Sequence, residues 1–169
     1  MGGLCRFAFA REVVITVETE KNMEKYEAYK AMKANLSKAM KSEFYYQAIF
    51  IEYAIIEDRC LSALVHAGVK YQDSKGYELK LSRKIEKMRR NPAFTDSYVR
   101  EKITEELLDR ILEWKRDRDI LIHALAKIPY DNDHVKNVAE QGMELVRILD
   151  NKVRIINRLF DSISNKESE

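Results

Sequence analysis

The chain has 169 residues, of which 46% are hydrophobic and 34% are charged, so it can bury the core of one domain without covalent staples. Its net charge of +2 excludes a strongly basic coat for nucleic acid, and any affinity for polyanions must come from a local patch. Cys5 and Cys60 have neither a disulfide framework nor metal-ligand spacing, and no apolar run approaches the roughly 18 residues of a membrane span. We therefore expect a cytoplasmic protein without membrane association.

Residues 1–22 differ in composition from the rest of the chain. The stretches Arg6-Phe-Ala-Phe-Ala and Val13-Val-Ile-Thr-Val are aromatic or β-branched with partial alternation, which favours a strand. The alternative is a poorly ordered arm, in which case the functional protein could begin near Met23. We divide the chain into an N-terminal arm, 1–22, and a helical domain, 23–165.

Apolar residues recur every three or four positions from Met23 to Val65, which is too long for one ordinary helix. Ser42 is a common N-cap residue and precedes the acidic Glu43, so we expect a break there. The pattern then predicts helices over about 23–40 and 43–67, and Gly68 ends the second helix.

A short basic helix is predicted over about 79–90, after a loop and before the Asn91-Pro92 boundary. Six of the eleven residues from Lys80 to Arg90 are basic. Such a run is most often a solvated face, but it could also guide RNA towards a cleft through phosphate contacts. The candidate RNA-binding residues are Lys80, Arg83, Lys84, Lys87, Arg89 and Arg90.

Two further long helices complete the prediction. Ser97 is a candidate N-cap for a helix over about 98–126, Pro129 marks the turn, and the last helix covers about 134–163. The predicted fold is all-α: an up-and-down helical bundle of four main helices plus a short extra helix.

The helix over 98–126 places an arginine, Arg118, on its apolar line, at about 100° per residue. The apolar members of that line are Ile103, Leu107, Ile111, Trp114, Leu121 and Leu125. If the line is buried, the guanidinium must meet an anion or enough acceptors, and Glu57 is a candidate for that anion. Alternatively, Arg118 folds over Trp114, one turn earlier, and sends its head to water.

The segment Arg118-Asp119-Ile-Leu-Ile-His123 resembles the motif of the HEPN superfamily: an arginine, a polar residue, three further residues and a histidine. The stretch from Glu43 to Leu64 resembles the early helix of those small all-α domains, in which a small residue, an aromatic residue and a glutamate recur. The resemblance covers about residues 24–163. It implies a HEPN-like bundle and a metal-independent endoribonuclease, often a toxin or phage-defence effector. It also implies a homodimer with its active site between two motif helices, and an antitoxin or defence partner.

The resemblance also assigns roles to residues. Arg118 would hold the scissile phosphate, His123 would transfer protons during attack by the ribose 2′-hydroxyl, and Asp119 would fill the polar position. The product would be a 2′,3′-cyclic phosphate, and neither cofactor nor metal is implied. A guanidinium suits phosphate oxygens, and an imidazole exchanges protons near neutral pH. Glu57 and Trp114 are the supporting residues.

Helix geometry bears on how these groups could meet. Positions five apart are displaced by about 140° and 7.5 Å, so Arg118 and His123 do not share a face of a straight helix. A partner subunit or a distortion would have to bring them together. Asp119 and His123, four apart, do face one another, so Asp119 could orient the imidazole or could make only a surface contact.

Other interpretations remain open. Arg59 and His66 share a helix face and fit a looser motif with six intervening residues, which makes them the second choice, although Glu57 and Asp58 offer Arg59 ordinary ion pairing. The rival to an enzyme is a non-catalytic helical interaction protein in which Arg118 only fixes packing. A nucleotide-binding module without turnover is a third hypothesis.

Overall fold

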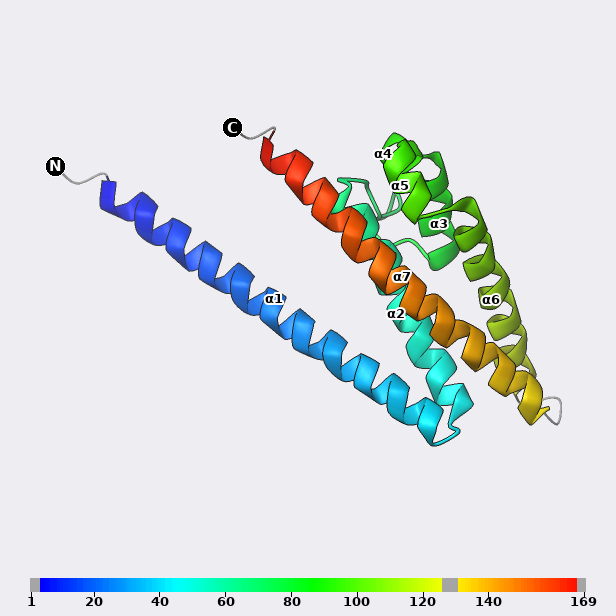
Figure 1. The fold of residues 1–169 in the computed structure, drawn as a ribbon. Helices are drawn as coiled ribbons and strands as arrows, with labels where there is room; N and C mark the ends of the chain where they lie inside the picture. The colour runs from blue at the N-terminus through cyan, green and yellow to red at the C-terminus, as the bar shows by residue number, and fades with distance from the viewer. Residues whose placement is uncertain (1–3, 126–130, 167–169) are drawn as a thin grey trace.

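The structure is a computed structural model that describes residues 4–125 and 131–166, with side chains described from Met23 onward within those ranges. The described chain is built from helices, which confirms the predicted all-α class (Figure 1). The helices are α1 (Leu4–Lys41), α2 (Tyr45–His66), α3 (Leu81–Arg90), α4 (Pro92–Thr95), α5 (Ser97–Lys102), α6 (Glu105–Ala124) and α7 (Asn132–Lys166). None of the helices in the described part of the chain is long and apolar enough to span a bilayer.

Helix α2 is at the centre of the molecule. It packs against α7, α1 and α3, while α6 packs against α7 and α3. Helices α2 and α7 therefore lie between α1 on one side and α3 to α6 on the other (Figure 1). The core is formed mainly by apolar residues that recur at helical spacing on α2 and α7, such as Ile49 and Ile56 on α2 and Leu145, Leu149 and Ile156 on α7.

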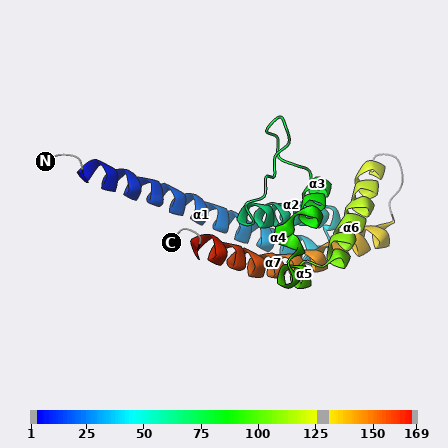
Figure 2. The ribbon, with the colours of Figure 1, turned by 90° about the horizontal axis from the view of Figure 1, so that it is seen from above.

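The N-terminal residues belong to a helix, so the strand alternative for residues 1–22 is wrong from Leu4 onward. Neither glycine nor proline interrupts the sequence from Leu4 to Lys41, so a helix that is nucleated by packing can continue at little cost per residue. Among the described side chains, Leu36 and Ala39 are buried. Figure 2 shows the N-terminal half of α1 running beyond the end of α7.

The break between α1 and α2 lies where it was predicted, but Ser42 does not cap α2. The N-cap is Phe44, which makes no side-chain capping bond. Backbone bonds make the turn instead: Ser42 N–H donates to the Lys38 carbonyl and Phe44 N–H to the Ala39 carbonyl. Glu43 adopts a φ of 59°, a left-handed conformation that is uncommon outside glycine.

The end of α2 at Gly68 is confirmed. Gly68 has a φ of 65°, its N–H donates to the Val65 carbonyl, and Val69 N–H donates to the Leu64 carbonyl. This pair of bonds is the Schellman motif, in which the position after the helix favours glycine. The following loop stands away from the helices (Figure 2).

The helix predicted over 98–126 is in fact two helices, α5 and α6. Asp96, not Ser97, caps α5, because its side chain accepts from the backbone N–H groups of Tyr98 and Val99. Thr104 caps α6 by accepting from Leu107 N–H at 3.1 Å. Ile103 lies between the two helices and is still buried. The apolar periodicity therefore continues across a break that the cap residue Thr104 creates.

Candidate functional site on helix α6

The apolar line of α6 faces the core. Leu107, Ile111, Trp114 and Leu121 are buried, whereas Leu125 at the C-cap is 40% exposed. The Trp114 indole N–H donates to the Val138 carbonyl of α7 at 2.9 Å. Trp114 therefore anchors α6 on α7.

Arg118 lies on this line and faces α2. Its Cζ atom is 4.4 Å from the centroid of the Tyr53 ring and 5.6 Å from that of Phe50, and its side chain is 18% exposed. Nη1 donates to Oδ1 of the adjacent Asp119 at 2.8 Å. The guanidinium is therefore held by aromatic faces and a carboxylate, and such stacking contributes about 0.5–2 kcal/mol.

Two expectations about Arg118 are wrong. The guanidinium stacks on Tyr53 of α2 and not on Trp114, because Trp114 is buried against α7. Glu57 is not the anion that meets Arg118: its Oε1 lies 3.5 Å from Nζ of Lys84, a buried cation on α3. The carboxylate bound by Arg118 comes from the next residue in the chain, Asp119.

A solvent-open hollow of about 720 Å³ lies along α6, next to the start of α3. We call it the α6 hollow. Its lining residues are Ser82 of α3 and Leu112, Lys115, Arg116, Asp119, Ile120, His123 and Ala124 of α6. Lys115, Asp119 and His123 follow one another at four-residue intervals and so lie on one face. Two cations, an imidazole and one carboxylate surround the space.

Asp119 connects Arg118 to this hollow. Its Oδ1 accepts from Arg118 and its Oδ2 from Lys115. Burial alone would raise the pKa of Asp119, but the hydrogen bonds and charges of Lys115 and Arg118 outweigh burial and lower that pKa below its usual value. Both carboxylate oxygens are thus engaged by cations, and the interaction by which Asp119 would orient His123 stays a prediction.

The structure brings only part of the predicted motif into one space. Asp119 and the exposed His123 line the α6 hollow, whereas the guanidinium of Arg118 packs towards α2 beside it. This arrangement agrees with the helix geometry, because positions five apart point in different directions.

The second-choice motif is separated in space. Arg59 contacts Asp58, stacks on the Tyr29 ring at 4.3 Å and has Nη1 3.9 Å from Asp150 Oδ1. His66 Nδ1 lies 2.6 Å from Oδ1 of Asp161, near the C-terminal end of α7. Arg59 and His66 therefore contact different residues in different parts of the fold.

The basic run on α3 is largely neutralised within the chain. Lys84 has no exposed surface and pairs with Glu78 and Glu57, so the prediction that it contacts RNA is wrong. Arg89 lies 3.1 Å from Glu105 and also pairs with Asp109 at the start of α6.

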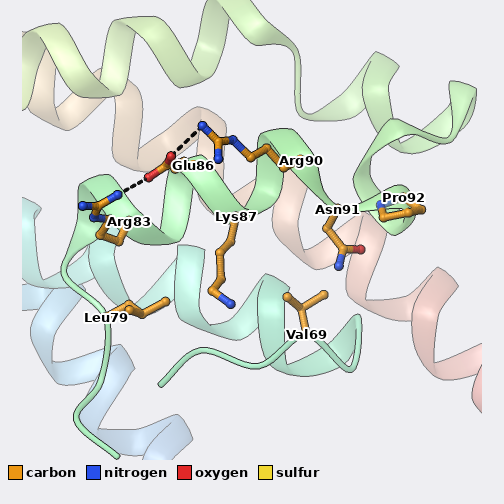
Figure 3. Close-up of a pocket in the computed structure, with 8 residues that line it drawn as sticks. All are labelled: Val69, Leu79, Arg83, Glu86, Lys87, Arg90, Asn91 and Pro92. Carbon is orange, nitrogen blue, oxygen red and sulfur yellow. Dashed lines mark hydrogen bonds and ion pairs between the residues drawn. The ribbon is translucent and has the colours of Figure 1, made fainter. Parts of the chain in front are cut away.

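Figure 3 shows the remaining charges around a hollow of about 410 Å³ beside α3. Arg83 and Arg90 both bind Glu86, at 2.7 and 2.8 Å. Lys87 points to another side of α3, towards the region of Leu79 (Figure 3). The exposed Lys80 and the half-buried Lys87 have no ion pair among the described residues, so they are what remains of the predicted RNA-binding run.

Sequence reasoning missed Glu52. This residue is fully buried in α2, and neither of its carboxyl oxygens has a hydrogen-bond partner among the described residues. Burial raises its pKa to about 9, so the carboxyl is protonated at neutral pH. The signal was available, because Glu52 shares a helix face with Ile49 and Ile56 in the same way that Arg118 shares one with Trp114.

No group of three or more histidine, cysteine or acidic side chains among the described residues is arranged to hold a metal ion. A comparison with models of known protein families, with curated proteins and with solved structures finds no match.

Proposed function

We propose that this chain is a HEPN-type endoribonuclease that cleaves RNA through attack of the 2′-hydroxyl, without a metal ion, and acts as a toxin or phage-defence effector. The motif resemblance supplies the chemistry. The observation that carries the proposal is that His123, Lys115 and Arg116 line one solvent-open hollow. An anionic ligand would meet three potential hydrogen-bond donors there.

The roles of these groups follow from their chemistry. His123 transfers protons between the 2′-hydroxyl and the leaving oxygen, since an imidazole does so near neutral pH. Lys115 and Arg116 balance the charge of the phosphate, and Asp119 holds Lys115 in place. Arg118 contacts the phosphate only if its guanidinium reaches a hollow that a second chain completes.

Exposed apolar residues near this site support a homodimer. Ile120 is 59% exposed in the lining of the α6 hollow, Phe50 is 48% exposed beneath Arg118, and Leu125 is 40% exposed at the end of α6. Ile120 is about 200° round the helix from Arg118, so it lies on the opposite side of α6 from Phe50. A partner chain that covers Ile120 would pack beside the α6 hollow, and two-fold dimers are the most common oligomers. A second α6 packed here would bring both motif helices to one cleft.

RNA cleavage in the presence of a metal chelator tests the proposal. Wild-type protein is expected to cut mixed RNA and leave 2′,3′-cyclic phosphate ends, and His123→Ala is expected to lower the rate by about a hundredfold or more. His134→Ala is the matched control, because His134 is also exposed but lies at the start of α7. Inert wild-type protein, or equal loss in both variants, would remove the basis for the proposal.

One observation favours the interaction-protein alternative. Arg118 stacks on Tyr53 and donates to Asp119, as expected for an arginine that fixes the packing of α6 on α2. On that hypothesis purified wild-type protein is inert towards RNA, and the His123→Ala variant does not differ from it.

A further inference from the structure

A basic groove lies on the surface between α1 and α7, away from α6. We define the α1–α7 groove as two adjoining hollows, of about 490 and 480 Å³, that share Lys33, Asp150 and Arg154. Lys30, Arg59 and Tyr26 line the first hollow, and Arg147 lines the second. Because the hollows share residues, together they form an extended track.

Cations outnumber carboxylates along this track. Lys30, Lys33, Arg59, Arg147 and Arg154 line it, whereas Asp150 is the one acidic residue among its described lining residues. Two further carboxylates bind cations of the track: Glu27 pairs with Lys30 and Asp58 with Arg59. The five cations still exceed these three carboxylates, so the groove suits a polyanion.

Asp150 holds Lys33 and Arg154 in position but does not use all of their N–H groups. It is 6% exposed and accepts hydrogen bonds from Tyr29 at 3.0 Å, Lys33 at 2.8 Å and Arg154 at 3.2 Å. The side chains of Lys33 and Arg154 nevertheless remain 45% and 59% exposed. Their remaining N–H groups can therefore bind an entering anion whose site is already arranged.

An aromatic ring lies at one end of the cations. Tyr26 lines the first hollow and is 61% exposed, so its ring is open to stacking. Proteins that bind single-stranded nucleic acid usually combine a positively charged groove along the sugar-phosphate backbone with exposed aromatic rings on which bases stack. An acidic peptide would use the charges but would gain little from the ring.

We propose that the α1–α7 groove binds single-stranded RNA through its phosphates, with a base stacked on Tyr26. The identity of the polymer rests on the proposed ribonuclease function, whereas the groove itself does not. The groove holds RNA at a surface separate from the α6 hollow, and it gives Arg59 a role that is independent of His66.

The test uses the full chain carrying His123→Ala, and measures binding to a fluorescent single-stranded RNA of about twelve nucleotides by anisotropy. Adding Lys30→Glu and Arg147→Glu is expected to raise Kd about tenfold or more and to reduce the salt dependence by about 0.7 per lost phosphate contact. The control pair is Arg100→Glu and Lys136→Glu, which are exposed cations outside the groove. This pair is expected to leave Kd within about twofold.

Stacking is tested separately at Tyr26. Tyr26→Ala is expected to raise Kd about fivefold or more, and Tyr26→Phe is expected to leave it unchanged, because only the ring is needed. Equal weakening by the groove pair and the control pair would overturn the proposal in favour of general charge attraction. If Tyr26→Ala leaves Kd unchanged, and polyglutamate displaces the labelled RNA as well as unlabelled RNA does, the ligand of the groove would be an acidic peptide and not RNA.

The two proposals can fail separately. If the wild-type chain cuts no RNA but the groove variants lose RNA binding, the ribonuclease proposal is wrong and the groove stands. If cleavage depends on His123 but the groove variants bind RNA like the control pair, the groove proposal is wrong and the ribonuclease stands.

Discussion

Two ionisable side chains, Arg118 and Glu52, lie on the buried faces of their helices with opposite consequences. Arg118 has both an aromatic and an acidic partner, since Tyr53 and Asp119 contact the guanidinium. Glu52 has no such partner among the described residues, so burial favours the neutral acid and raises its pKa to about 9. The difference lies in the partners: Arg118 has an aromatic ring on α2 and a carboxylate on its own helix, whereas Glu52 has neither a cation nor a hydrogen-bond donor in the part of the chain that the structure describes.

The protonated Glu52 makes stability depend on pH. Its ordinary pKa is 4.5 and its folded pKa is about 9, so its contribution is complete below pH 4.5. Between these values only the folded chain holds the proton, and each pH unit lowers the free energy of unfolding by about 1.4 kcal/mol. Asp119 and Asp150 have lowered pKa values and titrate below this window.

Urea unfolding between pH 5 and 8 measures this effect. Glu52→Gln has no carboxyl proton to lose at this position. The free energy of unfolding of this variant is therefore expected to fall less steeply with pH than that of the wild type, by about 1.4 kcal/mol per pH unit. Parallel profiles for wild-type protein and Glu52→Gln would show that Glu52 is ionised in the folded chain.

At the scale of the helices, the contact of α2 with α7 depends on Gly142. A Cβ atom added at Gly142 would lie 2.1 Å from Oε2 of Glu52 and 2.8 Å from Nε1 of Trp114. The Trp114 indole cannot move easily, because its N–H is bonded to the Val138 carbonyl. The glycine therefore lets three helices approach closely at one point.

Gly142→Ala is expected to destabilise the protein, although alanine favours a helix by about 1 kcal/mol over glycine. Overpacking at this contact is expected to outweigh that gain and to cost about 1–3 kcal/mol. In a Glu52→Ala background, the same substitution should cost less, because the colliding carboxyl has been removed. Thermal unfolding of the wild type, the two single variants and the double variant measures both effects. A Gly142→Ala variant more stable than the wild type would contradict the packing described.

The sequence predicted helices well where one local signal acted alone. Periodicity gave α2, α3 and α7, and Gly68 gave the end of α2. Two signals compete near residue 103: Ile103 continues the apolar period, whereas Thr104 caps a new helix, and the structure follows the cap. The β-branched residues near the N-terminus suggested a strand, but nothing in the sequence interrupted the helix.

The candidate site was less predictable, because its contacts join distant parts of the chain. Arg118 was found from its place on an apolar line, but its partner Tyr53 lies on another helix. Lys84 was grouped with exposed cations because its partner Glu57 is on α2. Rotation about a helix axis shows which side chains are buried, but it does not show what they meet.

At the scale of the whole molecule, the proposed ribonuclease site needs a second chain to bring Arg118 and His123 together. His123 lines the α6 hollow, while the guanidinium of Arg118 packs against α2 beside it. A two-fold dimer would pair the arginine of one copy with the histidine of the other. The α1–α7 groove of each copy would remain available to RNA, since it lies on a different side of α2 and α7.

Co-expression of two differently tagged inactive chains, Arg118→Ala and His123→Ala, tests this arrangement most directly. In a mixed dimer, one site loses both groups and the other keeps both, so random pairing is expected to restore about a quarter of wild-type RNA cleavage. Cleavage no greater than that of either variant alone, in a mixture shown by the tags to contain mixed dimers, would contradict a site shared between two copies of α6.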